Sequence, residues 1–152
     1  MDDEIREFGA ALGKKVLAQD WSSVRDMLAP WLSTSLSAES IRNFFEDEYK
    51  LTLSDNDIDE MHYPESPEPE VDGNDFMNAS ELRKPVSWAN GKVRPIADEV
   101  TDDNMRYWMK LQLQCSNEQM ESLGFDHFCE VWMAIVQTAE GLRVGYWSQG
   151  AH

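Results

Sequence analysis

A run of strict alternation near residue 110 constrains the fold of this 152-residue chain more than any other feature. From Met105 to Cys115 every second residue is apolar, and the residues between them are mostly Arg, Lys and Gln. Successive side chains of a strand point to opposite sides, so this period is typical of a strand with one face on a core. The sequence therefore predicts a strand over 105–115.

Two further segments repeat the pattern. Residues 127–138 alternate in the same way, and residues 142–147 alternate again after the turn residues Ala139, Glu140 and Gly141. A parallel pair of strands needs a connection of a dozen or more residues, whereas the turn here leaves room only for a hairpin. We therefore expect an antiparallel meander.

The two faces of this meander differ in chemistry. One face is aliphatic apart from Tyr107 and Tyr146, so we expect it to lie on the core. The opposite face mixes tryptophan with charged side chains: Trp108, Trp132, Trp147, Arg106, Lys110, Glu130 and Arg143. Aromatic and Arg side chains are enriched at the centres of protein interfaces, so this face is a candidate partner-binding surface. The alternative is that other segments of the same chain cover the tryptophans.

Helical patterns fill the first third of the chain. Asp2 or Asp3 can cap a helix that ends near Gln19, and Asp20 can cap a second, short helix that Pro30 ends. Ser37 can cap a third helix that ends near residue 50. Their apolar stripes need a surface to cover, and the aliphatic face of the meander supplies one. The sequence thus predicts an α+β fold, with three N-terminal helices packed on a curved antiparallel sheet in one domain over 1–152.

Residues 54–75 have the composition of a loop, with nine acidic residues, three prolines and no Lys or Arg. The segment opens like a calcium loop, but its sixth position holds Glu60 where Gly is needed and its twelfth holds Ser66 where Glu is needed. We therefore expect no metal there. The segment is either a solvated insertion or an acidic arm that docks on a basic partner through Asp55, Asp57, Asp59 and Glu60.

A second hairpin is indicated between Val86 and Val93. Asn90 and Gly91 both tolerate the positive φ angles of a tight type I′ turn, which makes this dipeptide a strong hairpin signal. We expect this hairpin to add strands to the meander.

The charge balance limits the partners. The net charge is −16 and the pI is about 4.4, so the phosphates of nucleic acids and anionic membrane surfaces should repel the chain. A basic protein is the charge-compatible partner. The N-terminus opens with acidic residues and no apolar leader, and no apolar run approaches the roughly 20 residues of a membrane helix, so we expect a cytoplasmic protein without a membrane contact.

Motifs for cofactor chemistry are not found. The three histidines, His62, His127 and His152, do not have the spacing of a metal site, and the chain has neither a phosphate-binding loop nor a dinucleotide-binding glycine pattern. We expect no cofactor and no metal.

The order of the predicted helices and strands is similar to that of a known superfamily. Three helices with an Asp20-Trp21 break, a helix over 37–49 and a final segment Gly141–Trp147 resemble the nuclear transport factor 2-like (cystatin-like or SnoaL-like) proteins. The resemblance implies a cone-shaped α+β fold that often dimerises through its sheet. The superfamily includes isomerases, dehydratases, ligand-binding modules, transport adaptors and toxin-immunity proteins.

Three functions follow as hypotheses. The first is a non-catalytic acidic protein that binds and neutralises a basic partner, most concretely an immunity protein against a cationic bacterial toxin. The alternative is a small-molecule binder, or an isomerase or dehydratase, that uses the cone interior. The resemblance implies that such an enzyme moves a proton with an Asp or His and a Tyr, for which Tyr107, Asp126 and His127 are the candidates. A third hypothesis is a protein that mimics nucleic acid and blocks a DNA-binding protein.

Overall fold

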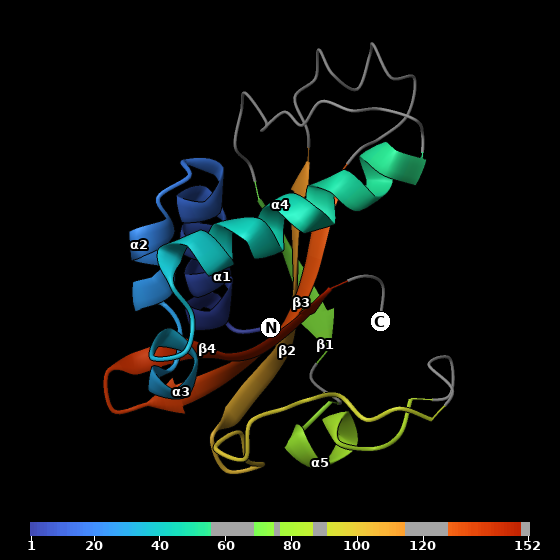
Figure 1. Cartoon of the computed structure of the whole chain (residues 1–152). Helices are drawn as coiled ribbons and strands as arrows, with labels where there is room; N and C mark the ends of the chain where they lie inside the picture. Colours follow the sequence, from blue (N-terminus) through green and yellow to red (C-terminus); the bar gives the residue numbers. More distant parts are fainter. Residues whose placement is uncertain (56–68, 75–76, 87–90, 115–127, 150–152) are drawn as a thin grey trace.

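The structure is a computed structural model that describes residues 1–55, 69–74, 77–86, 91–114 and 128–149 (Figure 1). It is α+β, as the sequence predicts. The helices are α1 Asp3–Leu17, α2 Trp21–Asp26, α3 Pro30–Ser33, α4 Ala38–Asp55 and α5 Ala79–Leu82, and the strands are β1 Glu70–Asn74, β2 Met105–Gln114, β3 Phe128–Thr138 and β4 Gly141–Gln149.

The predicted caps begin the first two helices. The Asp2 carboxylate accepts a hydrogen bond from the Ile5 N–H at 2.9 Å, and the Asp20 carboxylate accepts one from the Ser23 N–H at 3.3 Å. Each bond satisfies an N–H that has no partner inside its own helix. Pro30 follows the end of α2 as predicted but also begins α3, since proline suits the first helical position.

The four strands form one antiparallel sheet in the order β1-β2-β3-β4. The meander of β2, β3 and β4 is confirmed. The fourth strand is β1, which pairs with β2 and places Val71 opposite Leu111. Its residues fall in the segment predicted as acidic loop, and α4 also continues to Asp55, so these ends of the predicted loop are corrected.

The Val86–Val93 hairpin does not add strands among the described residues. Val86 and Lys92 form an isolated antiparallel bridge, and Gly91 has the expected positive φ of 78°. Residues 87–90, including Trp88 and Asn90, lie outside the described part of the chain.

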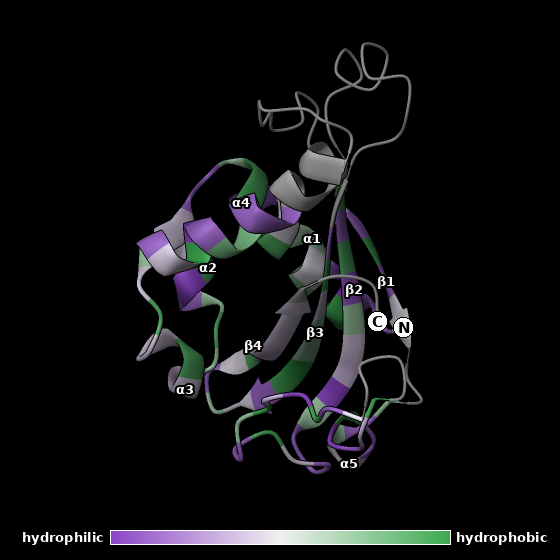
Figure 2. Ribbon diagram, turned by 45° about the vertical axis from the view of Figure 1, so that its right-hand side comes forward, coloured by the Kyte–Doolittle hydropathy of each residue, from purple (hydrophilic) through white to green (hydrophobic). Residues whose placement is uncertain are grey.

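The sheet separates two apolar clusters. Helices α1, α2 and α4 cover one face of the sheet (Figure 2). The main core lies between these helices and the sheet, and its Leu12, Phe45, Met109 and Met133 side chains are fully buried. We call this side the helix face. The opposite, outer face carries a smaller cluster, over which α5 and the segment 92–100 pack at the end of the sheet where β2 begins.

Two irregularities interrupt the strand alternation. Met105 pairs with Val136 and Tyr107 with Ile135, which leaves Arg106 as an extra residue in β2. Val144 pairs with Ile135 and Tyr146 with Ala134, which leaves Gly145 as an extra residue in β4. An extra residue in one strand is a β-bulge, and it exchanges the faces of the side chains on its two sides.

Candidate functional site: a groove along the outer edge of β4

The bulge at Gly145 separates the three predicted interface tryptophans. Trp108 and Trp132 lie on the outer face as predicted. Trp147 lies instead on the helix face, where its ring stacks on Phe44 with centroids 4.6 Å apart. Tyr146, predicted in the main core, lies on the outer face. The predicted single face with three tryptophans is therefore wrong, because alternation counted from Leu142 does not include the bulge.

The outer-face aromatic side chains form a row within the chain. The Trp108 ring stacks between Trp132 at 5.6 Å and Tyr146 at 6.3 Å. Two cations lie over the row, with Arg94 5.8 Å from the centroid of Trp108 and Lys110 5.8 Å from that of Trp132. Trp108 is only 2% exposed, so other parts of the same chain cover it. Trp132, at one end of this row, is half-buried, so its exposed part remains accessible to a partner.

Hydrogen bonds to backbone carbonyls hold the covering segment in place. The Arg94 guanidinium donates to the Leu82 carbonyl oxygen at 3.2 Å, and the Arg83 guanidinium donates to the Ala97 carbonyl oxygen at 2.9 Å. Asp102 accepts hydrogen bonds from the backbone N–H and hydroxyl of Ser80, which lower the pKa of its carboxyl group below the ordinary value. These bonds fix irregular backbone over the aromatic row.

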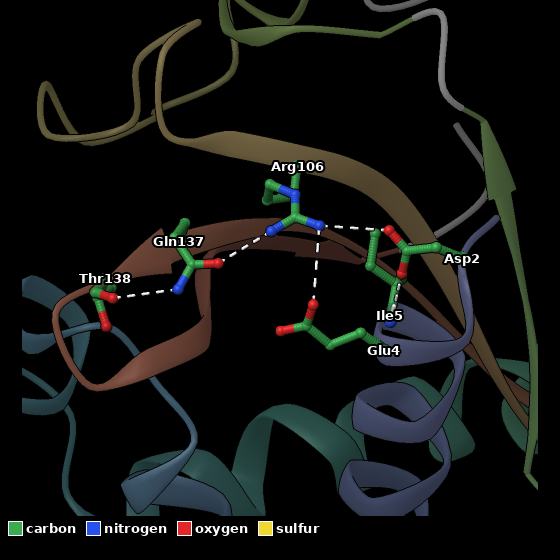
Figure 3. Close-up of polar contacts among 6 residues, drawn as sticks. All are labelled: Asp2, Glu4, Ile5, Arg106, Gln137 and Thr138. Atoms are coloured by element: carbon green, nitrogen blue, oxygen red, sulfur yellow. Dashed lines mark hydrogen bonds and ion pairs between the residues drawn. The ribbon is translucent and has the colours of Figure 1, made fainter.

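Arg106 binds within its own chain (Figure 3). Its guanidinium donates to the Gln137 side-chain oxygen at 2.9 Å and to the Asp2 carboxylate at 3.2 Å, and Glu4 lies 3.9 Å away. Asp2 thus caps α1 with one oxygen and pairs with Arg106 through the other. The predicted position beside the tryptophans is wrong, because the bulge at Arg106 turns this side chain toward α1.

The remaining predicted partner-binding residues are placed as follows. Arg143 donates to the carbonyl oxygen of its neighbour Leu142 at 2.7 Å, and Glu130 accepts from the Trp132 indole N–H at 3.1 Å. Asp55 is the last residue of α4. Asp57, Asp59 and Glu60 lie outside the described residues.

The alternative enzyme hypothesis needs an open interior between the helices and the sheet, but in the described part of the chain side chains of the main core pack there. Tyr107 is 8% exposed and lies within the main core among aliphatic side chains. Asp126 and His127 are outside the described residues, so the proposed group of three acid–base residues is not brought together in the described part of the molecule.

A surface groove lies where β4 meets α4. Its volume is about 620 Å³, and its apolar lining consists of Leu36, Phe44, Pro95, Tyr146 and Trp147. Its polar lining consists of Ser40, Asn43, Asp47 and Ser148. Asp47 is exposed, and the described lining residues include no Lys or Arg. The groove therefore offers an aromatic floor with one exposed carboxylate, that of Asp47, on its rim.

Sequence reasoning predicts Trp147 as an interface residue but does not predict the groove that it lines. Phe44 and Trp147 are about a hundred residues apart in the sequence, and the packing of α4 on the sheet, chiefly on β3, brings their rings into contact. Burial raises the pKa of the Tyr146 phenol above its ordinary value, while the Arg94 charge and the Ser148 hydroxyl oppose the increase.

Neither a cluster of metal ligands nor a membrane-spanning helix is found among the described residues. The described ranges contain no group of three or more His, Cys, Asp or Glu side chains placed to hold a metal ion. No helix in the described residues is long and apolar enough to span a membrane. Comparisons with protein-family models, with curated proteins and with solved structures find no match.

Proposed function

We propose that this chain is a non-catalytic interaction protein that binds a basic protein partner at the β4 groove. The observation that carries the proposal is the groove itself, with an aromatic floor, an exposed Asp47 and no cation among its described lining residues. Interface centres favour aromatic side chains, and acidic rims attract basic partners over several ångströms.

The net charge supports the same partner class. The chain has 29 acidic and 13 basic residues, so at least 16 carboxylates have no basic residue of their own to pair with (29 − 13 = 16). Several of its arginines donate to backbone carbonyls in the same chain, including Arg25 to Ser33 at 2.8 Å. Unpaired carboxylates raise the rate of encounter with a basic protein and make that rate sensitive to salt.

The concrete form of the proposal is an immunity protein that neutralises a cationic toxin, with the cone-shaped fold of the nuclear transport factor 2-like superfamily. The support for the fold is the placement of α1, α2 and α4 on one face of an antiparallel sheet that contains two bulges. Bulges bend and twist the strands that contain them, which favours a curved sheet. Among the described residues of the outer face, the region around Trp132 is the part open to a homodimer through that face, because the chain itself covers Trp108.

The test is affinity capture from a lysate of the source cells at about 50 mM and about 500 mM salt, with the partner identified by mass spectrometry. We expect one basic protein that is retained at low salt and weakened at high salt, since the higher ionic strength shortens the Debye length severalfold. The captured protein is then expressed alone and together with this chain. Growth inhibition that coexpression relieves supports toxin neutralisation, and capture of only acidic proteins or of none would refute the proposed function.

A matched pair of variants links the partner to the groove. Asp47→Arg reverses a charge on the groove rim, and Glu7→Arg reverses one on the exposed side of α1, away from the groove. Both side chains are exposed, so neither change should alter folding by more than about 0.5 kcal/mol. Asp47→Arg should reduce capture strongly and Glu7→Arg should not.

A further inference from the structure

The two edges of the sheet are protected to different degrees. The edge strand β1 is five residues long and carries the charged side chains of Glu70 and Asp72. Short length and charge are the features by which edge strands avoid pairing with other chains. The edge strand β4 is nine residues long, and backbone bonds join it at Val144 to the segment before α3.

These covering bonds stop at the bulge. The Val144 N–H donates to the Met27 carbonyl oxygen at 2.9 Å, and the Ala29 N–H donates to the Val144 carbonyl oxygen at 2.8 Å. The Gly145 carbonyl oxygen accepts the Trp31 indole N–H at 2.9 Å. Beyond Gly145, no described residue makes a backbone hydrogen bond with the outer edge of β4.

The uncovered half of β4 also has none of the usual protective residues. Residues 146–149 are Tyr, Trp, Ser and Gln, without charge and without proline. Tyr146 and Ser148 line the groove from the outer face, while Trp147 lines it from the helix face. The groove therefore lies along the strand edge itself, and it has room on both sides for the side chains of an added strand.

We propose that an extended, positively charged peptide segment of the partner pairs with β4 at residues 146–148 and continues the sheet as a fifth strand. This inference rests on the proposed function and specifies how the partner binds. Alternate side chains of the segment would reach opposite faces. Those on the helix side would contact Phe44 and Trp147, and a Lys or Arg there would reach Asp47.

Charge decides between this segment and a second copy of the chain. Antiparallel pairing of two β4 strands is geometrically allowed, but it would bring together two molecules of net charge −16 with an Asp47 on each rim. Like charges across an interface disfavour association. A cationic strand removes this repulsion and gives Asp47 a partner.

The experiment selects peptides from a display library of random 12-residue sequences on the purified full-length chain. We expect enriched peptides that contain several Lys or Arg residues alternating with apolar residues. Binding of the strongest peptide should shift the backbone amide NMR signals of residues 146–148. Alternate backbone N–H groups of a strand point to opposite edges, so methylating either the odd or the even peptide nitrogens, the two registers of methylation, removes the donors of one edge. One of these two methylated peptides should bind at least tenfold more weakly, because it lacks the donors that face β4.

The protein variants complete the test. Asp47→Arg should weaken the selected peptide at least fivefold, whereas Glu7→Arg should leave its affinity within twofold. Enrichment of uncharged or acidic peptides, amide shifts elsewhere only, or full affinity after methylation in both registers would overturn the inference, and so would a selection that enriches nothing. If Asp47→Arg weakens capture of a basic partner from lysate but methylation in both registers leaves the peptide affinity unchanged, the strand-pairing inference fails and the proposed function stands. If Asp47→Arg does not weaken capture, the groove is not the binding site and both proposals fail. A concentration-dependent dimer that shifts the same amides without peptide would assign the edge to a second copy and also overturn the inference.

Discussion

Replacement of Gly9 by alanine tests the packing of α1 on the unexpected strand β1. In an exposed helix, Gly→Ala stabilises by about 1 kcal/mol, because alanine loses less backbone entropy on folding. At Gly9 a Cβ would stand 2.8 Å from the Met109 sulfur and 2.8 and 2.9 Å from the two methyl groups of Val71. Overpacking of this kind costs about 1–3 kcal/mol. We therefore expect Gly9→Ala to destabilise the fold by about 1 kcal/mol net.

A double-mutant cycle makes the test specific to β1. Val71→Ala removes two of the three close contacts, and the third involves the flexible Met109 side chain. In the Val71→Ala background we therefore expect Gly9→Ala to be neutral or stabilising, with a coupling of about 1–2 kcal/mol. Ala11→Gly, at an exposed position of the same helix, calibrates the helix propensity and should cost about 1 kcal/mol.

The measurement is urea-induced unfolding followed by far-UV circular dichroism, with free energies compared only where the slope with urea is unchanged. The reasoning is refuted if Gly9→Ala stabilises the otherwise unchanged chain by about 1 kcal/mol and the two substitutions are additive. That result would mean that β1 does not pack on α1.

Three further predictions concern the core, the β4 bulge and a surface carboxylate. Phe45→Ala should destabilise by about 3–5 kcal/mol in urea unfolding, because the ring is fully buried within the aromatic cluster. Trp31→Phe should cost about 1 kcal/mol in the same assay, since it removes the hydrogen bond to the Gly145 carbonyl oxygen. Hydrogen bonds from Ser80 lower the pKa of Asp102, so its contribution is complete above the unfolded pKa of about 4 and is lost as the pH falls through the lower folded value. Melting temperatures between about pH 2 and pH 6 should therefore fall less steeply for Asp102→Asn than for the unchanged chain.

The main elements are predictable because their signals are local. The alternation that the structure follows from Tyr107 onward reflects burial of the aliphatic face of β2, and Val131, Met133 and Ile135 of β3 repeat it. The caps at Asp2 and Asp20 are equally local, because each carboxylate binds an N–H three residues later. Such features depend on neighbours in the sequence, so the sequence alone identifies them.

Strand β1 is not predictable in this way. It contains one large apolar residue, Val71, and its other four residues are Glu70, Asp72, Gly73 and Asn74. Five residues with a single apolar side chain have no measurable period. Its stability depends on the close approach of α1, which Gly9 and Gly13 permit, and on Gly73, whose φ of 149° suits glycine. The sequence does not show which segment packs against each of these glycines, so they could not be used to predict β1.

The β4 bulge shows why the candidate site required the structure. The sequence around Gly145 gives no sign of a bulge. Leu142, Val144 and Tyr146 alternate with Arg143, Gly145 and Trp147 as they would in a regular strand. A Cβ at Gly145 would stand 2.8 Å from a Val136 methyl group and 3.2 Å from the Trp31 ring, so close packing on both sides of β4 favours glycine there. The extra residue turns Trp147 onto Phe44 and turns Tyr146 to the outer face. Among the described residues, Gly145 is also the last residue of β4 that bonds to the segment around α3. The groove and the uncovered part of the strand edge therefore begin at the same position.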